Sequence, residues 1–387
     1  MSIAQTLIPD VVELIAEKVA DRETHRDALS FALVCKDWQD AGIKALYRNL
    51  DGPRTRAGKA ISARPELAQL VRRLRLSLGP HFEGDLHLLR TLTRLQHLVV
   101  GGTAPAGSNL LKTLATLPSI PNLRILLLSA ADEASEVDVA SVFAILERAT
   151  SLHTFLFSTP LGCDLESTVE VRTPPHRLSQ LSLHHGHAMY GGVGFDCDEQ
   201  ECRRAQTLLL KSFDFSSLHS FATCIDLTSP TLHTLLSTAS NLRSLHLRND
   251  CAQTFLNLLP LSLTIPSLVS LRTLSVADDV SGSFGKSAPP VVGTEALLAA
   301  LPPTLQHLTL LVFFAEGVTH PALSRFLDSR RVGPLETVKV WYPDDLGRNR
   351  KQLLKKERAT GGEGDDPAVW QWLEVRDSLS TRPTRAS

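Results

Sequence analysis

The chain has 387 residues, of which 43% are hydrophobic and 21% charged, and its formal net charge is -1 at pH 7. These proportions are typical of a folded protein and exclude a fully disordered one. The neutral balance argues against nucleic acid as the main partner, because phosphate-binding proteins carry an excess of basic residues. The length would allow several ordinary domains, but a repeat array of this size can also form one body.

No segment of the sequence predicts secretion or membrane insertion. Residues 1–7 lack the basic start and the long apolar run of a secretory signal, and no apolar stretch reaches membrane-spanning length. The longest, residues 258–271, contains Pro260 and Pro266 and is expected to be a loop before a strand. The six cysteines have no paired spacing, which favours reduced thiols. We expect a soluble protein of the cytoplasm, the nucleus or both, with no membrane partner.

The first fifty residues predict three short helices. Apolar residues fall at helical spacing over residues 8–19, and Pro9 suits a helix start. A second helix is expected from Thr24, whose hydroxyl can cap exposed amides, and an apolar stripe continues over residues 38–47. The apolar residues of the second helix are Leu29, Leu33 and Val34. Such a unit has little core of its own, so an apolar face left over would need a partner.

Two phrases in this region resemble an F-box. Residues 32–38, Ala-Leu-Val-Cys-Lys-Asp-Trp, together with residues 45–50, Ala-Leu-Tyr-Arg-Asn-Leu, are similar to its second half, and Leu-Val-Cys-Lys-x-Trp is the most specific part. Residues 7–15 resemble its first half, which usually opens Leu-Pro-x-Glu. Here Ile8 stands where the proline belongs and Pro9 comes one place later. In these phrases the chain resembles fungal F-box domain-containing proteins.

The resemblance covers residues 7–50 and implies docking onto the Skp-type adaptor of a cullin-RING ubiquitin ligase. The side chains that it implies at the adaptor interface are Pro9, Val12, Leu33, Val34, Cys35 and Trp38. The alternative is that Val34, Cys35 and Trp38 simply form the core of a three-helix unit. Cys35 has no base near it in the sequence, so it is a poor candidate for a nucleophile.

The F-box at residues 1–50 is followed by an expected connector with a short helix at 51–69 and by a repeat region at 70–345. The repeat region opens with the basic run Arg72, Arg73 and Arg75. Such a run can bind polyanions, but at this neutral overall charge a solvated strand edge is favoured.

The repeat region is built on the phrase Leu-x-x-Leu-x-Leu, which returns about every thirty residues, a period typical of solenoids. Its ten copies begin at Val71, Leu95, Leu123, Leu152, Leu178, Leu218, Leu242, Leu271, Leu305 and Leu335. Helical patterns between them span residues 84–92, 108–117, 137–149, 199–211, 229–239, 252–259, 294–301 and 321–329. The pattern resembles an irregular leucine-rich-repeat horseshoe, an α/β fold of strand-helix units with a parallel concave sheet, similar to those found behind F-boxes.

The strand period of two assigns the faces of each repeat. The first, fourth and sixth positions of the phrase should point inward, and the third, fifth and seventh should line the concave sheet, where repeat proteins bind their partners. Apolar residues on neighbouring strands would form a patch there, and Arg and Trp are frequent at interface hot spots. The substrate-binding candidates are Val99, Ile125, Leu127, Leu156, Arg248 and Trp341. Alternatively, a loop or the tail covers the apolar ones.

Residues 184–202 interrupt the repeat with three histidines and two cysteines. Their spacing fits no zinc finger or ribbon, and the nearby glycines lack the Gly-Lys-Ser/Thr of a phosphate-binding loop. A second interruption, residues 280–294, is rich in Gly, Ser and Pro and predicts a surface loop. No hydrolase, metalloprotease or dinucleotide motif is present either. We expect no catalytic residue, no metal site, no cofactor and no enzyme activity.

Residues 346–387 are expected to form a tail. Residues 348–358 are basic and helix-prone, an acidic glycine-rich link follows, and the alternating residues 370–375 suggest a last strand that caps the solenoid. The sequence thus predicts a substrate-recognition adaptor of a Skp/cullin/F-box ubiquitin ligase with an unknown protein substrate. The alternatives are a non-catalytic repeat scaffold without a ubiquitin role, and a metal or hydrolase site in the first interruption.

Overall fold

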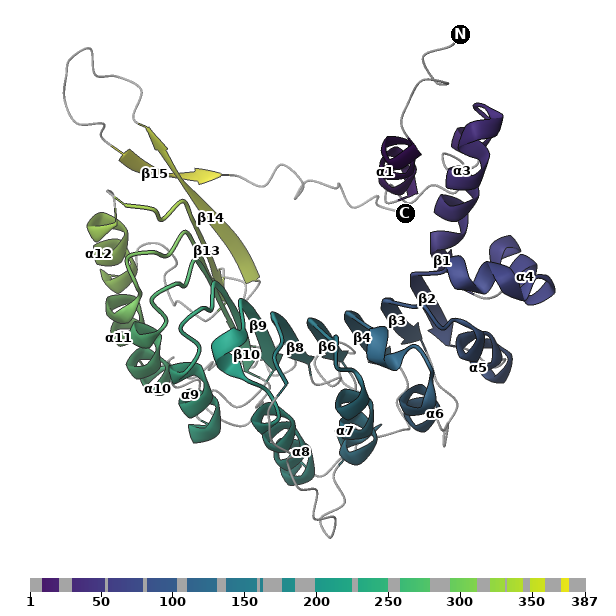
Figure 1. Cartoon of the computed structure of the whole chain (residues 1–387). Helices are drawn as coiled ribbons and strands as arrows, with labels where there is room; N and C mark the ends of the chain where they lie inside the picture. The colour runs from purple at the N-terminus through teal and green to yellow at the C-terminus, as the bar shows by residue number, and fades with distance from the viewer. Residues whose placement is uncertain are drawn as a thin grey trace, which may run out of the picture. The chain divides into compact units, whose positions relative to one another are not determined.

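The structure is a computed structural model (Figure 1) that divides into two compact units, Met1–Asp164 and Leu165–Ser387. It describes residues 9–20, 30–52, 55–78, 82–102, 110–130, 137–158, 161–162, 176–184, 199–224, 229–249, 258–278, 293–311, 321–330, 333–343, 349–358 and 370–375. Within this part of the chain, no helix is long and apolar enough to cross a membrane.

The first unit is built on a parallel sheet in the order β1-β2-β3-β4-β6. Its strands are β1 (Asn49–Asp51), β2 (Arg73–Leu78), β3 (His97–Gly102), β4 (Ile125–Ala130) and β6 (Thr154–Ser158). Its helices are α1 (Pro9–Ala20), α3 (Lys36–Arg48), α4 (Arg56–Ala63), η2 (Pro65–Leu70), α5 (Phe82–Thr91), α6 (Leu110–Thr116), η3 (Ile120–Asn122) and α7 (Val139–Arg148). The short strands β5 (Val137–Asp138) and β7 (Leu161–Gly162) pair separately. Helices α5, α6 and α7 lie along one side of the sheet (Figure 1).

The second unit repeats the same plan. Six parallel strands of the described chain run β8 (Gln180–His184), β9 (Ser220–Cys224), β10 (Ser244–Asn249), β11 (Thr273–Asp278), β12 (His307–Leu311) and β13 (Thr337–Pro343). The antiparallel strands β14 (Asn349–Arg358) and β15 (Trp370–Val375) extend the sheet. Its helices are α8 (Glu199–Lys211), η5 (Phe215–Ser217), α9 (Pro230–Ser237), α10 (Leu259–Thr264), η6 (Ile265–Ser267), α11 (Thr294–Ala300) and α12 (Pro321–Ser329).

The leucines of the repeated phrase build the core of each unit. In the second unit Leu245, Leu274 and Leu308 stand in register on neighbouring strands, and all three are fully buried. Burying a leucine side chain stabilises a fold by about 1.5–3 kcal/mol. All ten phrases form strands, each beginning two residues after the first position of its phrase. The predicted α/β class and the parallel pairing of the repeat strands are therefore confirmed.

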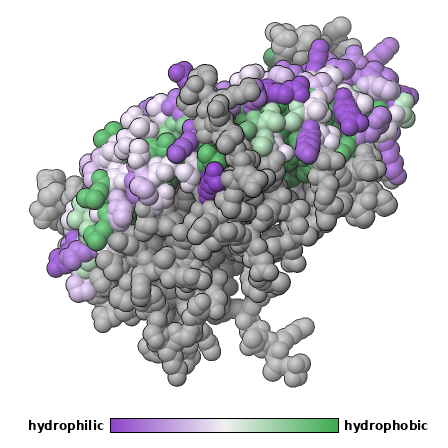
Figure 2. All heavy atoms as spheres, turned by 90° about the horizontal axis from the view of Figure 1, so that it is seen from below, coloured by the Kyte–Doolittle hydropathy of each residue, from purple (hydrophilic) through white to green (hydrophobic). Residues whose placement is uncertain are grey.

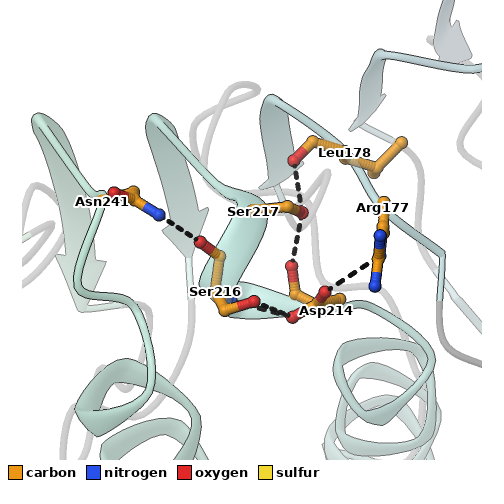
Figure 3. A network of polar contacts seen from close by, with 6 residues as sticks. All are labelled: Arg177, Leu178, Asp214, Ser216, Ser217 and Asn241. Atoms are coloured by element: carbon orange, nitrogen blue, oxygen red, sulfur yellow. Dashed lines mark hydrogen bonds and ion pairs between the residues drawn. The ribbon is translucent and has the colours of Figure 1, made fainter.

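Polar side chains hold successive turns of the second unit together just before the strands (Figure 3). Asp214 pairs with Arg177 at 3.5 Å and accepts hydrogen bonds from the amide and hydroxyl of Ser216. The Ser217 hydroxyl donates to the carbonyl of Leu178, and the Asn241 amide donates to the carbonyl of Ser216. A typical hydrogen bond contributes about 1 kcal/mol, and exposed contacts such as the Arg177–Asp214 pair contribute less because water screens them. These turns lie before the strands, outside the backbone hydrogen bonds of the sheet. The side-chain network therefore links one turn to the next.

The structure corrects two predictions in the second unit. Residues 349–358, expected to be helix-prone, form β14 because they pair along β13, whose edge would otherwise be left open. Residues 258–271, expected to be a loop, hold α10 and η6. Residues 252–257 of the helix predicted at 252–259 lie outside the described residues. Pro260 sits at the start of α10, where its missing amide hydrogen costs nothing.

The predicted second helix of the first fifty residues is described only in part. Residues 30–32 form a helical turn, and Leu33 and Val34 lie in the bend that follows it. Residues 21–29, where the helix was expected to begin, lie outside the described part of the chain, as do residues 185–198 and 279–292 of the two interruptions.

Candidate protein-binding surfaces

The helices of the first fifty residues share a small apolar core. Its buried side chains are Val12, Ala16, Phe31, Ala41 and Ala45, with Ile15, Trp38 and Leu46 packed against them. The rings of Phe31 and Trp38 stack with their centroids 4.6 Å apart. Gly42 lets α3 approach the turn at residues 30–32, because a Cβ at this position would lie 2.4 Å from the Cβ of Ala32. The core is small, but its side chains and the backbone at Gly42 are closely packed.

The same helical unit leaves large apolar side chains in solvent. Leu33 is 77% exposed and Val34 is 51% exposed, side by side in the bend before α3. Leu14 is 57% exposed and Val11 is 38% exposed, three residues apart and so on one face of α1. Only three other large hydrophobic side chains of the described residues are comparably exposed. Exposed apolar pairs on a small unit are candidate interaction surfaces.

The six predicted adaptor-binding residues fall into four groups. Leu33 and Val34 are exposed, as an interface requires. Val12 lies in the core at 5% exposure, and Trp38 is half-buried against Phe31, so both support the fold of the unit. Cys35 is a half-buried free thiol that precedes α3 without capping it through its side chain. The side chain of Pro9 lies outside the described residues, although its backbone begins α1.

Sequence reasoning overlooked Val11 and Leu14 as surface residues. The signal was present in the helical period: Val12 and Ala16 are four residues apart on the buried face, which turns Val11 and Leu14 outward. The helical pattern read from the sequence places Val11 on the same apolar stripe as Val12 and leaves Leu14 unassigned. Val11 and Leu14 form a second exposed apolar pair on the helical unit, in addition to Leu33 and Val34.

The second candidate surface is the face of the first unit's sheet that points away from the core. Val99, Leu127 and Leu156 stand in register on β3, β4 and β6, and Arg75 continues their row on β2. Ile125 belongs to the neighbouring row, in register with His97. The four apolar side chains of the two rows are half-buried. Because parallel strands lie about 4.8 Å apart, the row from Val99 to Leu156 spans about 10 Å.

The remaining two predicted substrate-binding residues belong to the second unit. Arg248 lies on β10, in register with Ala277 of β11, and its side chain is half-buried. The backbone of Trp341 pairs with Lys351 of β14, but its side chain lies outside the described residues, as does that of His184. The structure therefore brings together the apolar candidates of the first unit, whereas Arg248 and Trp341 lie on strands of the other unit.

The described part of the chain contains no metal-binding cluster. Among these residues no group of three or more His, Cys, Asp or Glu is placed to hold a metal ion. Most of the first interruption, with Cys197 and His187, lies outside the described residues. Figure 2 shows a face on which hydrophilic and hydrophobic residues are interspersed, as is usual for a surface facing water.

Comparison with known proteins adds no family to this description. No protein-family model matches the chain, and no curated protein matches its sequence. Its function has to be inferred from the residues and surfaces described above.

Proposed function

We propose that the chain is a substrate-recognition adaptor of a Skp/cullin/F-box type ubiquitin ligase. In this role the helical unit at residues 1–50 acts as an F-box that binds the Skp-type adaptor protein. The parallel sheets act as a leucine-rich-repeat platform that holds a protein substrate. Other subunits of the ligase carry out the transfer of ubiquitin, so the chain needs neither a catalytic residue nor a cofactor. The role places the protein in the cytoplasm or the nucleus.

The observation that carries the proposal is the exposed pair Leu33 and Val34. An apolar pair in solvent costs free energy unless a partner covers it, at about 25 cal/mol for each Å² of apolar surface. The pair lies in the phrase Leu-Val-Cys-Lys-x-Trp, the most specific part of the F-box resemblance. If the helical unit served only to pack against the repeats, Leu33 and Val34 would be expected to be buried against the repeat region. Their exposure therefore favours the adaptor over a scaffold that uses the helical unit for internal packing.

The substrate side of the proposal rests on the outward face of the first unit's sheet. The row Arg75, Val99, Leu127 and Leu156 combines a cation with three apolar side chains on adjacent strands. Such a row suits a protein segment with an apolar centre and an acidic end. Holding the segment beside a charged conjugating enzyme raises its effective concentration to about the millimolar range, which is how a non-catalytic subunit accelerates transfer.

Binding to a purified Skp-type adaptor tests the first half of the proposal. Leu33→Asp and Val34→Asp place a charge where an apolar partner is expected, and each should weaken binding by about 30-fold or more, the size of a hot-spot loss. Both side chains are exposed, so the melting temperature of the protein should not change.

Leu263→Asp is the matched control, because Leu263 is 84% exposed on α10 of the other unit. It introduces the same charge at similar exposure and should leave adaptor binding unchanged. Equal binding by Leu33→Asp and Leu263→Asp, or failure of the folded wild-type chain to bind the adaptor, would contradict the proposal and favour the scaffold.

A further inference from the structure

A pocket of about 430 Å³ lies within the first unit, between the helices of the first fifty residues and the first repeats. Helix α3 contributes Lys44 and Arg48 to its lining. Residue Gln69 of η2 and Arg72, which precedes β2, form a second side, and Arg94 and Gln96, which precede β3, form a third. A volume of this size falls within the range of small-molecule sites.

The lining of the pocket carries charge of one sign. Lys44, Arg48, Arg72 and Arg94 are cationic, and the described residues that line the pocket include no Asp or Glu. The two glutamines add amide groups that can donate hydrogen bonds. Such a grouping of basic side chains is unusual in a chain whose 40 basic residues are balanced by 41 acidic ones.

The sheet itself places two of the cations, Arg48 and Arg72, side by side. The amide of Arg72 donates to the carbonyl of Arg48 at 2.9 Å, and the amide of Gln96 donates to the carbonyl of Arg72 at 2.8 Å. The three residues therefore stand side by side at the starts of β1, β2 and β3, about 4.8 Å apart. One guanidinium nitrogen of Arg72, Nη1, also donates to the carbonyls of Gln69 at 2.9 Å and Arg94 at 3.4 Å. These bonds hold the guanidinium of Arg72 at the pocket.

The protein bears an electrostatic cost for this arrangement. Burial lowers the pKa of Arg72, and repulsion from Arg94 and Arg48 lowers it further. The guanidinium nevertheless stays charged near neutral pH, because arginine titrates so far above it. An anion bound among these groups would be attracted to each cation, and this attraction would offset the repulsion between the cations.

Two structural explanations account for only part of the cluster. The C-terminal end of a helix stabilises a cation through its dipole, which explains Arg48 in the last turn of α3. Solvation explains the exposed side chains of Lys44 and Arg94. The carbonyls of Gln69 and Arg94 fix the position of Arg72 but do not neutralise its charge, and the described pocket lining holds no carboxylate that would.

We propose that this pocket binds a small molecule with two or more phosphate groups. Arginine matches phosphate oxygens through paired hydrogen bonds, and four cations are more than one phosphate needs. The ligand would bridge α3, η2 and the start of β3, and so brace the helical unit against the first repeats. The site is independent of the adaptor and substrate surfaces proposed above, because it uses none of their residues.

Isothermal titration calorimetry with inorganic pyrophosphate and tripolyphosphate on the full chain tests the proposal. We expect saturable binding at one site, an affinity that rises from pyrophosphate to tripolyphosphate, and weaker binding at high salt. Arg94→Gln removes a cation while its backbone carbonyl still accepts from Arg72, so the fold should survive. This variant and Arg72→Gln should each weaken binding by at least tenfold.

Arg272→Gln is the matched control. Arg272 immediately precedes β11 as Arg72 precedes β2, and its amide donates to the carbonyl of Arg243 in the same way, but it does not line the pocket. The control should bind both anions as the wild type does. Addition of the ligand should slow hydrogen exchange in residues 36–48 (α3) and 65–70 (η2). Protection of these two segments would show that the ligand binds in the pocket that they line.

Any one of three results from calorimetry or hydrogen exchange would overturn the proposal. These are no saturable binding of either anion, equal affinity of Arg94→Gln and Arg272→Gln, and protection from exchange confined to residues outside the first unit. Binding of a phosphoserine peptide without binding of pyrophosphate or tripolyphosphate would also overturn it, in favour of a modified protein as the ligand. Because the readout is anion binding alone, failure here leaves the adaptor-binding test unaffected.

Discussion

The indole ring of Trp38 stacks on the ring of Phe31 at a centroid distance of 4.6 Å and an angle of 26°. The stack joins the helical turn at residues 30–32 to α3, and the bend with Leu33 and Val34 lies between its two partners. Trp38 is itself half-buried on the apolar core of the helical unit. The stack therefore positions the exposed pair that we propose as the adaptor contact.

We expect Trp38→Ala to lower the free energy of unfolding by about 2 kcal/mol, less than for a fully buried Trp. Trp38→Phe keeps an aromatic partner for Phe31 and should cost about 1 kcal/mol or less. Urea unfolding of each variant measures both values. Trp38→Ala should lower both adaptor binding and stability. Leu33→Asp should lower adaptor binding and leave stability unchanged. Unchanged stability of Trp38→Ala would show that the stack does not support the unit.

Gly42 is expected to reject even a methyl group. A Cβ at this position would lie 2.4 Å from the Cβ and 2.5 Å from the Cα of Ala32, and the backbone of that turn cannot move away freely. Alanine gains about 1 kcal/mol over glycine in helix propensity, but overpacking of this kind costs about 1–3 kcal/mol. We expect Gly42→Ala to lower the melting temperature.

Gly101→Ala is the comparison for this substitution. A Cβ there would meet the carbonyl oxygen of Ser129 at 3.5 Å, an ordinary contact, so the melting temperature should stay nearly unchanged. A Gly42→Ala variant as stable as Gly101→Ala would mean that α3 and the turn at residues 30–32 are not closely packed.

Neighbouring leucines of β4 should differ sharply in their contribution to stability. Leu126 is fully buried in the core, whereas Leu127 lies half-buried on the opposite face of the sheet. Leu126→Ala should lower the free energy of unfolding by about 3 kcal/mol, the typical cost of a core cavity. Leu127→Ala should cost about 1 kcal/mol or less, measured by the same denaturant titration.

The same pair separates folding from substrate binding. If the outward row holds the substrate, Leu127→Asp should reduce the recovery of proteins that accumulate on the chain under proteasome inhibition. Adaptor binding should stay intact, because Leu127 lies on the sheet and not on the helical unit. Equal substrate recovery by Leu127→Asp and wild type would exclude this row as the contact.

The second unit should lose stability in mild acid. His176 is half-buried beside Phe213, with ring centroids 6.4 Å apart, and burial lowers its pKa below the usual 6.5. The unfolded chain then binds a proton more readily than the folded one. Stability from this group is complete above pH 6.5 and falls as the pH drops below that value towards the folded-state pKa.

Thermal unfolding followed from about pH 7.5 to pH 5 measures this effect. His176→Gln should give a flatter dependence on pH than the wild type. His219→Gln, which replaces an exposed histidine of the same unit, should retain the wild-type slope. Parallel profiles for wild type and His176→Gln would assign the acid sensitivity to other groups.

Local patterns in the sequence were sufficient to predict most of the repeat architecture. Each Leu-x-x-Leu-x-Leu phrase became a strand, and its inward positions, such as Leu98 and Val100, are buried. The prediction succeeded because successive side chains of a strand point to opposite faces, so the buried positions follow from consecutive residues alone. The helices at residues 199–211 and 321–329 were predicted with the observed bounds for the same reason.

Contacts between distant residues decided the rest. The basic segment at residues 349–358 has no strand signal of its own and becomes β14 only because β13 offers an open edge. Val12 and Leu33 are similar apolar residues, yet packing of α1 on α3 buries the first and leaves the second in solvent. The pocket brings together Lys44 of α3 and Arg94, which precedes β3, and no local spacing reveals this proximity. By itself, the sequence determined the strands and their buried faces. Only the tertiary structure decided which apolar and basic side chains meet at a surface, since that depends on residues brought together by folding.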